Sequence, residues 1–529
     1  MAARGPGGFA PLRHKTFRTL WLAQFTSNIG GWMQTVGAQW LMLSLTGSAA
    51  YLAFIQSAAS LPVLLFAIPA GAVGDLVDRR RLLLASTAAM TVAATALAVL
   101  ALLDLLTPWV LLGLLFAVGT GQAWTSPTWQ SLQPELVDED ERPQAIALGS
   151  VNQNLARAVG PAIGGALVAL TEPSVTFLVN AASFVVVIWA VWRWHGAQRA
   201  VTSTLPREHV LAAMRASGRY VRNSPALRAV LVRAAAFVLC ASALWALLPS
   251  IAHGPLGLGS GGYGLLLGCV GVGAVGGAIV LPRVRGRLAP DPSLALGTLL
   301  VAGPSLVLAE VHVVAVAAVA LVVAGAGWIL SLATLNATYQ ALLPSWIKAR
   351  GLAFYLIVFQ GGTAIGSAVM GLLTTAFAVT EVLAGAAVVL ALTPLFTWRH
   401  AIPKIPPHEL LPAGGEAPLH ALDESLNAAA GPVQVRIVRH AAPGREADLV
   451  AAVSGVERLR RRTGAIGWSC WRDAEDPARV VEEFLVASWE DHQRQHERIT
   501  VRDRARLDQI AACTDRPPAV EHWVFAGGA

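Results

Sequence analysis

The sequence predicts an all-α polytopic membrane protein that carries a small α+β domain at its C-terminal end. Hydrophobic residues make up 55% of the 529 residues and charged residues only 13%, whereas soluble domains average roughly 45–50% and 25%. The first 400 residues divide into twelve apolar runs, each near the ~20 residues that a helix needs to cross a bilayer. Beyond residue 432 the pattern of hydrophobic residues becomes that of a soluble domain.

Each apolar run is expected to form one membrane-spanning helix. Gly and Pro interrupt several runs, but membrane helices tolerate them where neighbouring helices satisfy the freed backbone groups. Arg13, Lys15 and Arg18 precede the first run, which is too long for a cleaved signal peptide. The approximate spans are 19–45, 50–74, 82–105, 108–132, 144–170, 174–194, 227–252, 261–283, 293–311, 313–341, 350–376 and 380–398.

Positively charged residues predict how these helices are oriented. If the N-terminus is cytoplasmic, the inner connections hold basic clusters such as Arg79, Arg80 and Arg81, whereas the outer connections contain no Lys or Arg. This asymmetry is the one that sets orientation in membrane proteins. Because the number of spans is even, both termini are expected in the cytoplasm.

The basic net charge does not indicate a nucleic-acid partner. The net charge is +7, but residues 431–529 contain 15 basic and 15 acidic residues, so the whole excess lies in the apolar part. There the arginines occupy short loops between apolar runs instead of one amphipathic face. The partners that we expect are therefore the lipid bilayer and a small molecule.

The membrane domain is expected to cover residues 1–400, in halves at about 13–195 and 226–400. The cytoplasmic connection 196–225 contains an expected amphipathic helix at 205–220 that lies along the membrane surface. The two halves repeat each other in sequence, which is typical of transporters whose halves rock about a central site. The matching positions are 129–130 with 339–340, and Gly160 and Gly164 with Gly362 and Gly366.

The C-terminal part is expected to be a linker at 401–432 followed by a folded domain at 433–529. The linker is rich in Pro, Ala and Gly. Strand-like and helical patterns then follow in β-α-β-β-α-β order, which predicts a ferredoxin-like domain. The expected strands are 433–440, 465–472, 479–488 and 519–525, and the expected helices are 443–462 and 489–513.

The connection after the second span carries the motif GAVGDLVDRRR at 71–81. Gly71 permits close helix approach, Asp75 lies where a helix end can offer backbone donors, and the arginines anchor the inner face. The alternative is an ordinary positively charged inner loop. The spacing resembles the signature loop of the major facilitator superfamily, which implies a gating role for Gly71, Asp75, Arg79 and Arg80.

The fifth run contains the sequence GPAIGG at 160–165. Small residues four apart let helix backbones touch, and Pro161 bends the helix. Such spacing is also common in packed helices of other proteins. It resembles the Gly-Pro motif that exporters of the superfamily carry in this helix, which implies a packing role for Gly160, Pro161, Gly164 and Gly165.

Nearly the whole chain resembles the transmembrane secretion effector branch of the superfamily, related to the enterobactin exporter. The resemblance rests on the twelve spans, the loop at 71–81, the segment PTWQSLQP at 127–134 and the fused C-terminal domain. It implies export of a small molecule, a siderophore or another secondary metabolite, by alternating access. Leu115 stands where proton antiporters of the superfamily commonly carry an Arg, which leaves proton coupling open. A multidrug efflux pump or an importer of the same fold is the alternative.

Polar residues inside the spans are the candidates for substrate contact, because such residues are costly in the bilayer and usually face the interior of the bundle. Gln24, Asn28, Thr35 and Gln39 share one stripe of the first span. For a single Asn or Gln, a hydrogen bond that only holds two helices together is an equal alternative. The candidate residues are Gln24, Asn28, Gln56, Asn154, Arg157, Asn336 and Gln360.

Arg157 is the charged candidate. It lies 14 residues from both Pro143 and Thr171, which places it near the bilayer midplane, where insertion scales assign Arg roughly 2.5–3.5 kcal/mol. It could bond helix carbonyls and the nearby Asn154. Alternatively, the planar guanidinium offers its donors to an anionic or phenolic substrate, because its fork suits oxygen acceptors.

The soluble domain shows no metal, cofactor or catalytic signature. His492 and His496 lie one helical turn apart, but Gln493 stands where a metalloprotease needs Glu, so a solvated helix face is expected. The four cysteines are scattered and form neither a disulfide framework nor a CxxC pair. The element order resembles the antibiotic biosynthesis monooxygenase-like dimeric α+β barrels, which implies self-association. The alternative from another class is a membrane-tethered, cofactor-independent monooxygenase.

Overall fold

The computed structural model describes residues 9–76, 78–194, 210–397, 401–402, 405–413 and 431–525. The chain forms two compact units. The first, called here the helical unit, comprises Met1–Val201, Leu231–Asn336 and Ala353–Ala401. The second, called the C-terminal unit, comprises Thr202–Val230, Ala337–Leu352 and Ile402–Ala529. Two short segments from within the predicted membrane region therefore group with the C-terminal residues.

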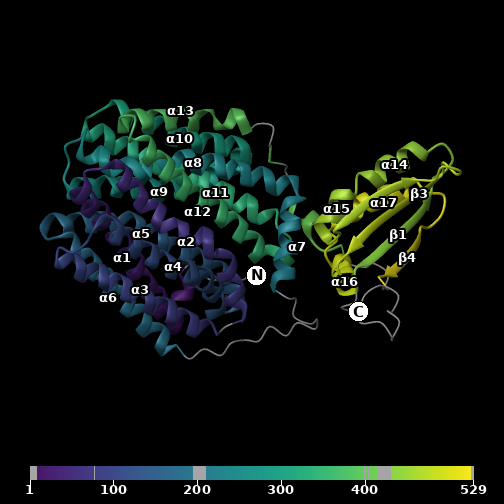
Figure 1. Cartoon of the computed structure of the whole chain (residues 1–529), viewed down its shortest axis with the longest axis horizontal. Coiled ribbons are helices and arrows are strands. Elements are labelled where there is room, and N and C mark those ends of the chain that lie inside the picture. Colours follow the sequence, from purple (N-terminus) through teal and green to yellow (C-terminus); the bar gives the residue numbers. More distant parts are fainter. Residues whose placement is uncertain are drawn as a thin grey trace, which may run out of the picture. The chain divides into compact units, whose positions relative to one another are not determined.

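All twelve predicted runs are helical (Figure 1). By length and mean hydropathy, nine helices within the described part of the chain qualify as candidate membrane spans. α1, α4 and α5 are not among them, so the count of twelve spans stays a prediction. The bounds are α1 Lys15–Thr46, α2 Ala49–Leu76, α3 Arg79–Leu102, α4 Pro108–Leu132, α5 Arg142–Leu170, α6 Pro173–Arg193, α8 Pro225–His253, α9 Ser260–Arg287, α10 Pro290–Glu310, α11 Val314–Ala341, α12 Lys348–Leu373 and α13 Val379–Thr397.

Local chemistry explains where several of these helices begin and end. Asp78 accepts a hydrogen bond from the Arg81 backbone N–H at 2.9 Å and so caps α3. Thr107 caps α4 in the same way, and Pro108 follows it at the first helical position, where the missing N–H does no harm. Gly47 ends α1 in the left-handed conformation with φ 60°, which glycine adopts at little cost.

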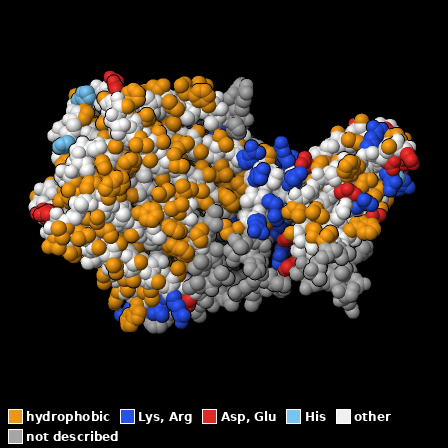
Figure 2. All heavy atoms as spheres, viewed as in Figure 1, with side chains coloured by type: hydrophobic (Ala, Val, Ile, Leu, Met, Phe, Trp, Pro, Cys, Tyr) orange, Lys and Arg blue, Asp and Glu red, His pale blue; other side chains and the backbone are white. Residues whose placement is uncertain are grey.

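The outer surface of the helical unit is apolar. Figure 2 shows a face of this unit covered mostly by hydrophobic side chains with few charges. Large side chains on several helices are more than half exposed, among them Val92, Trp192, Val272 and Val319. Apolar surface on this scale is unfavourable in water, so the helical unit is built to be surrounded by lipid.

The helical packing repeats between the two halves. A Cβ placed on Gly160 would lie 2.6 Å from the Trp32 Cβ, so α5 approaches α1 closely there. In the second half, a Cβ on Gly362 would lie 2.3 Å from a Val238 methyl, and one on Gly366 would lie 2.5 Å from the Leu239 carbonyl oxygen. Helix α5 thus packs on α1 in the first half as α12 packs on α8 in the second half, in agreement with the sequence repeat.

The C-terminal unit contains a four-stranded antiparallel sheet with strand order β2-β3-β1-β4 (Figure 1). The expected helix at 443–462 is broken near Gly455, and the expected helix at 489–513 is broken before Thr500, whose side chain caps a new helix. The bounds are β1 Val433–His440, α14 Glu446–Ser454, α15 Glu457–Thr463, β2 Gly467–Arg472, β3 Arg479–Val486, α16 Trp489–Glu497, α17 Val501–Ala511 and β4 Ala519–Val524.

A charged group lies within the core of this domain. Glu482 on β3 has no exposed surface, and its carboxylate accepts hydrogen bonds from Arg439 at 2.9 Å and from Arg460 at 2.9 Å. The Trp468 indole N–H donates to the same carboxylate at 3.2 Å. Burial alone would raise the pKa of Glu482, but the two guanidinium groups lower it to about 2.

Helix α7, Val210–Arg222, is the described part of the predicted amphipathic helix. Its residues Ser217 and Tyr220 are buried, and α7 packs against α15 of the C-terminal domain. The Arg462 guanidinium lies 5.8 Å from the Tyr220 ring, and Tyr220 meets Trp346 edge to face at 5.6 Å. A protein surface therefore covers part of the face that the sequence predicts to lie on the membrane.

Candidate functional site

Arg157 on α5 has no hydrogen-bond partner within the described part of the chain. Its Nε and Nη1 atoms are buried without a partner, while the side chain as a whole is partly exposed. Asn154, the neighbour that could have bonded it, donates instead to the Ser150 carbonyl at 2.9 Å. The guanidinium carbon lies 5.5 Å from the centre of the Trp32 ring on α1, a distance that suits a cation–π interaction.

Several close contacts join the first half of the helical unit to the second. A Cβ on Gly165 would lie 2.7 Å from the Gly264 Cα, and one on Gly271 would lie 2.2 Å from the Ala158 Cα. The Ser57 hydroxyl donates to the Ala364 carbonyl at 2.8 Å on the other side of the bundle. Ala158 follows Arg157 directly, so Arg157 lies next to one of these contacts between the halves.

Two further contacts join the first half of the helical unit to the second. Tyr263 on α9 donates its hydroxyl to the Gln39 amide oxygen on α1, and both side chains are buried. Trp40 meets His253 edge to face with ring centres 5.7 Å apart. Gln39 from the polar stripe of the first helix thus serves to join the halves.

The other polar candidates are bonded within the bundle. Gln24 donates to Asn28 at 3.1 Å, and Asn28 donates to Asn152 at 2.8 Å, which ties α1 to α5. Gln56 donates to Ser60 one turn away at 3.4 Å. Asn336 also has an interaction partner, whereas Gln360 is partly exposed. Arg157 differs from Gln24, Asn28, Gln56 and Asn154 because its donors are unpaired.

The loop at 71–81 lies at the predicted inner end. Arg79 forms an ion pair with Glu135 at 2.7 Å, and Arg80 donates to the carbonyls of Val191 and Trp192 at the end of α6. Gly71 and Asp75 belong to α2, but their surroundings lie outside the described residues. The two arginines therefore hold helices of the first half together at this end.

The GPAIGG motif faces two different neighbours. Gly160 and Gly164 approach α1, where a Cβ on Gly164 would lie 2.8 Å from the Met33 Cα. Gly165 instead approaches Gly264 of α9 in the opposite half. Pro161 lies inside α5, and its carbonyl oxygen would be 2.6 Å from a Cβ on Gly264. The motif therefore supports both packing within one half and closure between halves.

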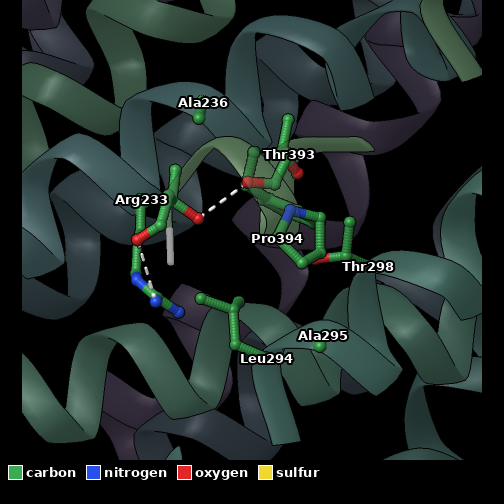
Figure 3. Close-up of a pocket in the computed structure, with 9 residues that line it drawn as sticks. Arg233, Ala236, Leu294, Ala295, Thr298, Thr393 and Pro394 are labelled. Atoms are coloured by element: carbon green, nitrogen blue, oxygen red, sulfur yellow. Dashed lines mark hydrogen bonds between the residues drawn. The ribbon is translucent and has the colours of Figure 1, made fainter. Parts of the chain in front are cut away.

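Sequence reasoning missed a second buried arginine. Arg233 on α8 is 6% exposed, forms an ion pair with Asp291 at 2.8 Å and donates to the Thr397 carbonyl at 3.1 Å. Figure 3 shows it beside a small pocket that Leu294, Thr298 and Pro394 also line. An Arg inside the predicted span 227–252, with Asp291 just before the span at 293–311, was the available signal. Arg233 is thus satisfied by the protein itself.

The prediction of a solvated face at His492 and His496 is wrong. His492 is 2% exposed, its Nε2 lies 3.0 Å from the Nε2 of His522 on β4, and its ring centre lies 4.8 Å from that of His496. The sequence separates His522 from His492 by 30 residues, so only the folded sheet brings them together. No group of three possible metal ligands was found within the described part of the chain.

We expect the stability of the C-terminal domain to fall as the pH is lowered from about 6.5 to about 4. Burial, together with His522, lowers the pKa of both His492 and His496 to about 4. The unfolded chain, with histidine pKa values near ~6.5, then binds more protons than the folded domain in this range. Urea unfolding of residues 431–529 should show a lower midpoint at pH 5 than at pH 7.5.

The matched variant is His492→Gln, which should lose much of this pH dependence. An unchanged wild-type midpoint between pH 7.5 and pH 5 would contradict a buried neutral cluster.

Comparison with known proteins places the chain in a family. Residues 6–527 match the transmembrane secretion effector family of the major facilitator superfamily. The chain belongs to this family. The chain is 29% identical to the staphyloferrin A transporter of Staphylococcus aureus over 31% of its own length and 42% of the relative. It is 30% identical to the multidrug efflux pump Tap of Mycolicibacterium fortuitum over 40% and 53% of the two chains.

Solved structures share the fold of this chain at low sequence identity. A bacterial homolog of the human lysosomal transporter Spinster, inward-facing and unoccupied, gives a TM-score of 0.58 at 14% identity over 74% of this chain and 96% of that one. A POT family transporter with 5-aminolevulinic acid gives 0.60 at 11% identity over 72% and 95%. The chain spans about half the length of the curated relatives it matches. The chain is thus a multi-pass membrane protein of the transmembrane secretion effector family, and it shares its fold with these solved transporters.

Proposed function

We propose that the protein exports a small anionic molecule by alternating access, with Arg157 in the substrate site. The observation that carries this proposal is the unpaired guanidinium, which lies next to the contact between Ala158 of the first half and Gly271 of the second. Arg233, which lies in the same helical unit, has a carboxylate and a carbonyl as partners. Because an unpaired charge in a bilayer is costly, an anionic substrate is the partner that Arg157 lacks.

The position of these contacts supports a state that is closed at the predicted outer end. Gly165–Gly264, Gln39–Tyr263 and Ser57–Ala364 all lie toward the predicted outer end. This reading rests on cytoplasmic termini, which the absence of Lys and Arg from the predicted outer loops supports. A reporter that is active only outside the cytoplasm, fused after Ala529, should therefore be inactive.

Transport by Arg157 variants tests the proposal. Arg157→Gln is expected to reduce export to near the background of vesicles without the protein, because the amide carries no charge. Arg157→Lys should export more weakly than the wild type, because a compact ammonium replaces a planar fork. Export would be measured as uptake into inverted vesicles, with protein amounts matched by immunoblot. Wild-type export by Arg157→Gln would contradict the site.

The same vesicles distinguish the alternatives of direction and range. Accumulation in right-side-out vesicles but not in inverted vesicles, under the same imposed gradient, would favour an importer. Equal transport of cationic and anionic compounds would favour a multidrug pump, as in the relative named Tap. A siderophore cargo, as in the relative named for staphyloferrin A, is the narrower form of the proposal, and it fits the proposed enterobactin-exporter branch.

Gating by the loop at 71–81 is part of the proposed cycle. Arg79 and Arg80 tie α3 to Glu135 and to the end of α6, which supports a rigid inner end in the first half. Asp75 and Gly71 are proposed to contact the opposite half in the inward-closed state. Such a contact would bias the population of the two states.

We infer that the C-terminal domain is ferredoxin-like and associates with a second copy through the free face of its sheet. The antiparallel order β2-β3-β1-β4 supports the fold. Trp471 and Trp523 are 60% and 56% exposed, and the strand register places them on the same sheet face as the Arg436–Glu483 ion pair. Residues 431–529 should sediment as dimers at micromolar concentration, and Trp523→Glu should produce monomers. Wild-type monomers would remove this proposal.

The monooxygenase alternative has a direct test in the same preparation. Turnover of a quinol-like substrate by residues 431–529 would favour it. The transporter family assignment covers the whole of this domain except its last residues, which supports a role within the transporter.

A further inference from the structure

A connected series of four aromatic rings begins at Arg157 and crosses from one half of the bundle to the other. Trp32 of α1 lies against the guanidinium, and Trp245 of α8 lies 6.4 Å from Trp32 between ring centres. Trp328 of α11 meets Trp245 edge to face at 5.2 Å, and Phe359 of α12 meets Trp328 at 6.1 Å. We call these four residues the aromatic ladder.

Unsatisfied hydrogen-bond donors flank the first ring of the ladder. Trp245 Nε1 is buried and has no partner within the described residues. Trp32 also lies against Arg157, whose Nε and Nη1 atoms are likewise buried without a partner within the described residues. A buried donor without a partner costs about 1–3 kcal/mol. Three such donors beside one indole ring favour a ligand that brings oxygen acceptors to this place.

The ladder lies where the two halves meet. Trp32 belongs to the first half, whereas Trp245, Trp328 and Phe359 belong to the second. Gly160 permits this arrangement, because a Cβ there would lie 2.6 Å from the Trp32 Cβ. Tryptophan in membrane proteins is concentrated at the bilayer surface, and Trp32 instead lies near the middle of its helix. Lipid anchoring therefore does not account for Trp32.

The charge of the site selects among ligands that stack on aromatic rings. Tryptophan faces alone attract cations, but the Arg157 guanidinium beside Trp32 repels them. A flat ring can stack on or between indoles, and an aromatic pair contributes about 0.5–1.5 kcal/mol beyond the burial of its area. Trp32 and Trp245 are only partly buried, so both present surface to such a ring.

We propose that the aromatic ladder and Arg157 form a subsite for a planar aromatic anion, such as an aryl carboxylate. The ring of the ligand stacks against Trp32 and Trp245, and its carboxylate accepts hydrogen bonds from Arg157 and from Trp245 Nε1. This inference rests on the proposed export of an anion and narrows it to a chemical class. Because Trp32 and Trp245 come from different halves, the ligand contacts both halves at once.

Binding of two matched acids to the purified full-length protein in detergent tests the subsite. The probes are 2-naphthoate and its fully saturated analogue, decahydro-2-naphthoate, which carries the same charge without a flat ring. We expect 2-naphthoate to bind at least tenfold more tightly. Trp245→Leu should weaken its binding about tenfold, whereas Trp245→Phe, which keeps a ring and loses only the N–H donor, should weaken it less.

Trp192→Leu is the matched control, because Trp192 is a 64% exposed tryptophan of α6 outside the ladder. It should leave both affinities unchanged. Equal affinity for the two acids, no binding of either, or unchanged 2-naphthoate binding by both Trp245 variants would overturn the subsite. If Trp245→Leu does not fold, the comparison of the acids and Trp245→Phe decides alone. Export in inverted vesicles is measured separately, so a protein that exports but fails these tests would lose the aromatic subsite and keep the proposed function.

Discussion

Gly165→Leu is expected to abolish most transport while the protein still reaches the membrane. A Cβ at this position would lie 2.7 Å from both the Gly264 Cα and the Ser260 carbonyl oxygen. Both neighbours are backbone atoms, so α5 and α9 must separate before a side chain fits. Overpacking of this kind costs about 1–3 kcal/mol or more, and about 1.4 kcal/mol already shifts an equilibrium tenfold. The state closed at the predicted outer end should therefore become rare.

Accessibility of the outer end measures this shift directly. In a cysteine-free background, Ser260→Cys places a thiol at a position that is 6% exposed in this structure. Addition of Gly165→Leu should increase its labelling by a membrane-impermeant thiol reagent at least severalfold. Gly113→Leu is the control, because a Cβ on Gly113 meets no atom within 4 Å. Unchanged labelling and unchanged transport in the Gly165 variant would show that this contact does not close the pathway.

Helix and strand positions were predictable because their signals are local. The run predicted at 108–132 is α4, Pro108–Leu132, and the strand predicted at 433–440 is β1, Val433–His440. Apolar length, strand alternation and caps such as Thr107 all act within a few residues of the chain. The break before α17 carried such a signal too, since Thr500 and Asp503 form a capping box.

Contacts between distant segments were not predictable in the same way. Nothing in the sequence near Gly165 states that it meets Gly264 of the other half while Gly160 meets Trp32. Arg157 could be identified as a candidate site residue because a single charged residue within an apolar run is apparent from the sequence itself. Trp245 could not, because its role depends on the ring of Trp32, 213 residues away. The separation of His492 from His522 concealed their pairing for the same reason.

Glu482→Gln is expected to destabilise the C-terminal domain by about 3–5 kcal/mol, the range for removal of one partner from a buried ion pair. The carboxylate is fully buried between Arg439 and Arg460. Glutamine has nearly the same shape but no charge, so the variant leaves two guanidinium groups without a counter-charge in the core. Urea unfolding of residues 431–529 at pH 7.5 measures the loss.

Glu483, the next residue along β3, provides the comparison that separates the effect of burial from the effect of removing a charge. Glu483→Gln removes the nearer of two carboxylate partners of Arg436 on the open face of the sheet, where the arginine side chain is 42% exposed, and should cost less than about 1 kcal/mol. The acid response distinguishes Glu482 from the histidines. Its lowered pKa, about 2, means that its stabilisation is complete above the unfolded value near ~4.3 and is lost only as the pH falls toward 2. The loss of stability between pH 7.5 and pH 5 should therefore be as large in Glu482→Gln as in the wild type, and smaller in His492→Gln. Equal unfolding midpoints for wild type and Glu482→Gln would contradict a buried charge network.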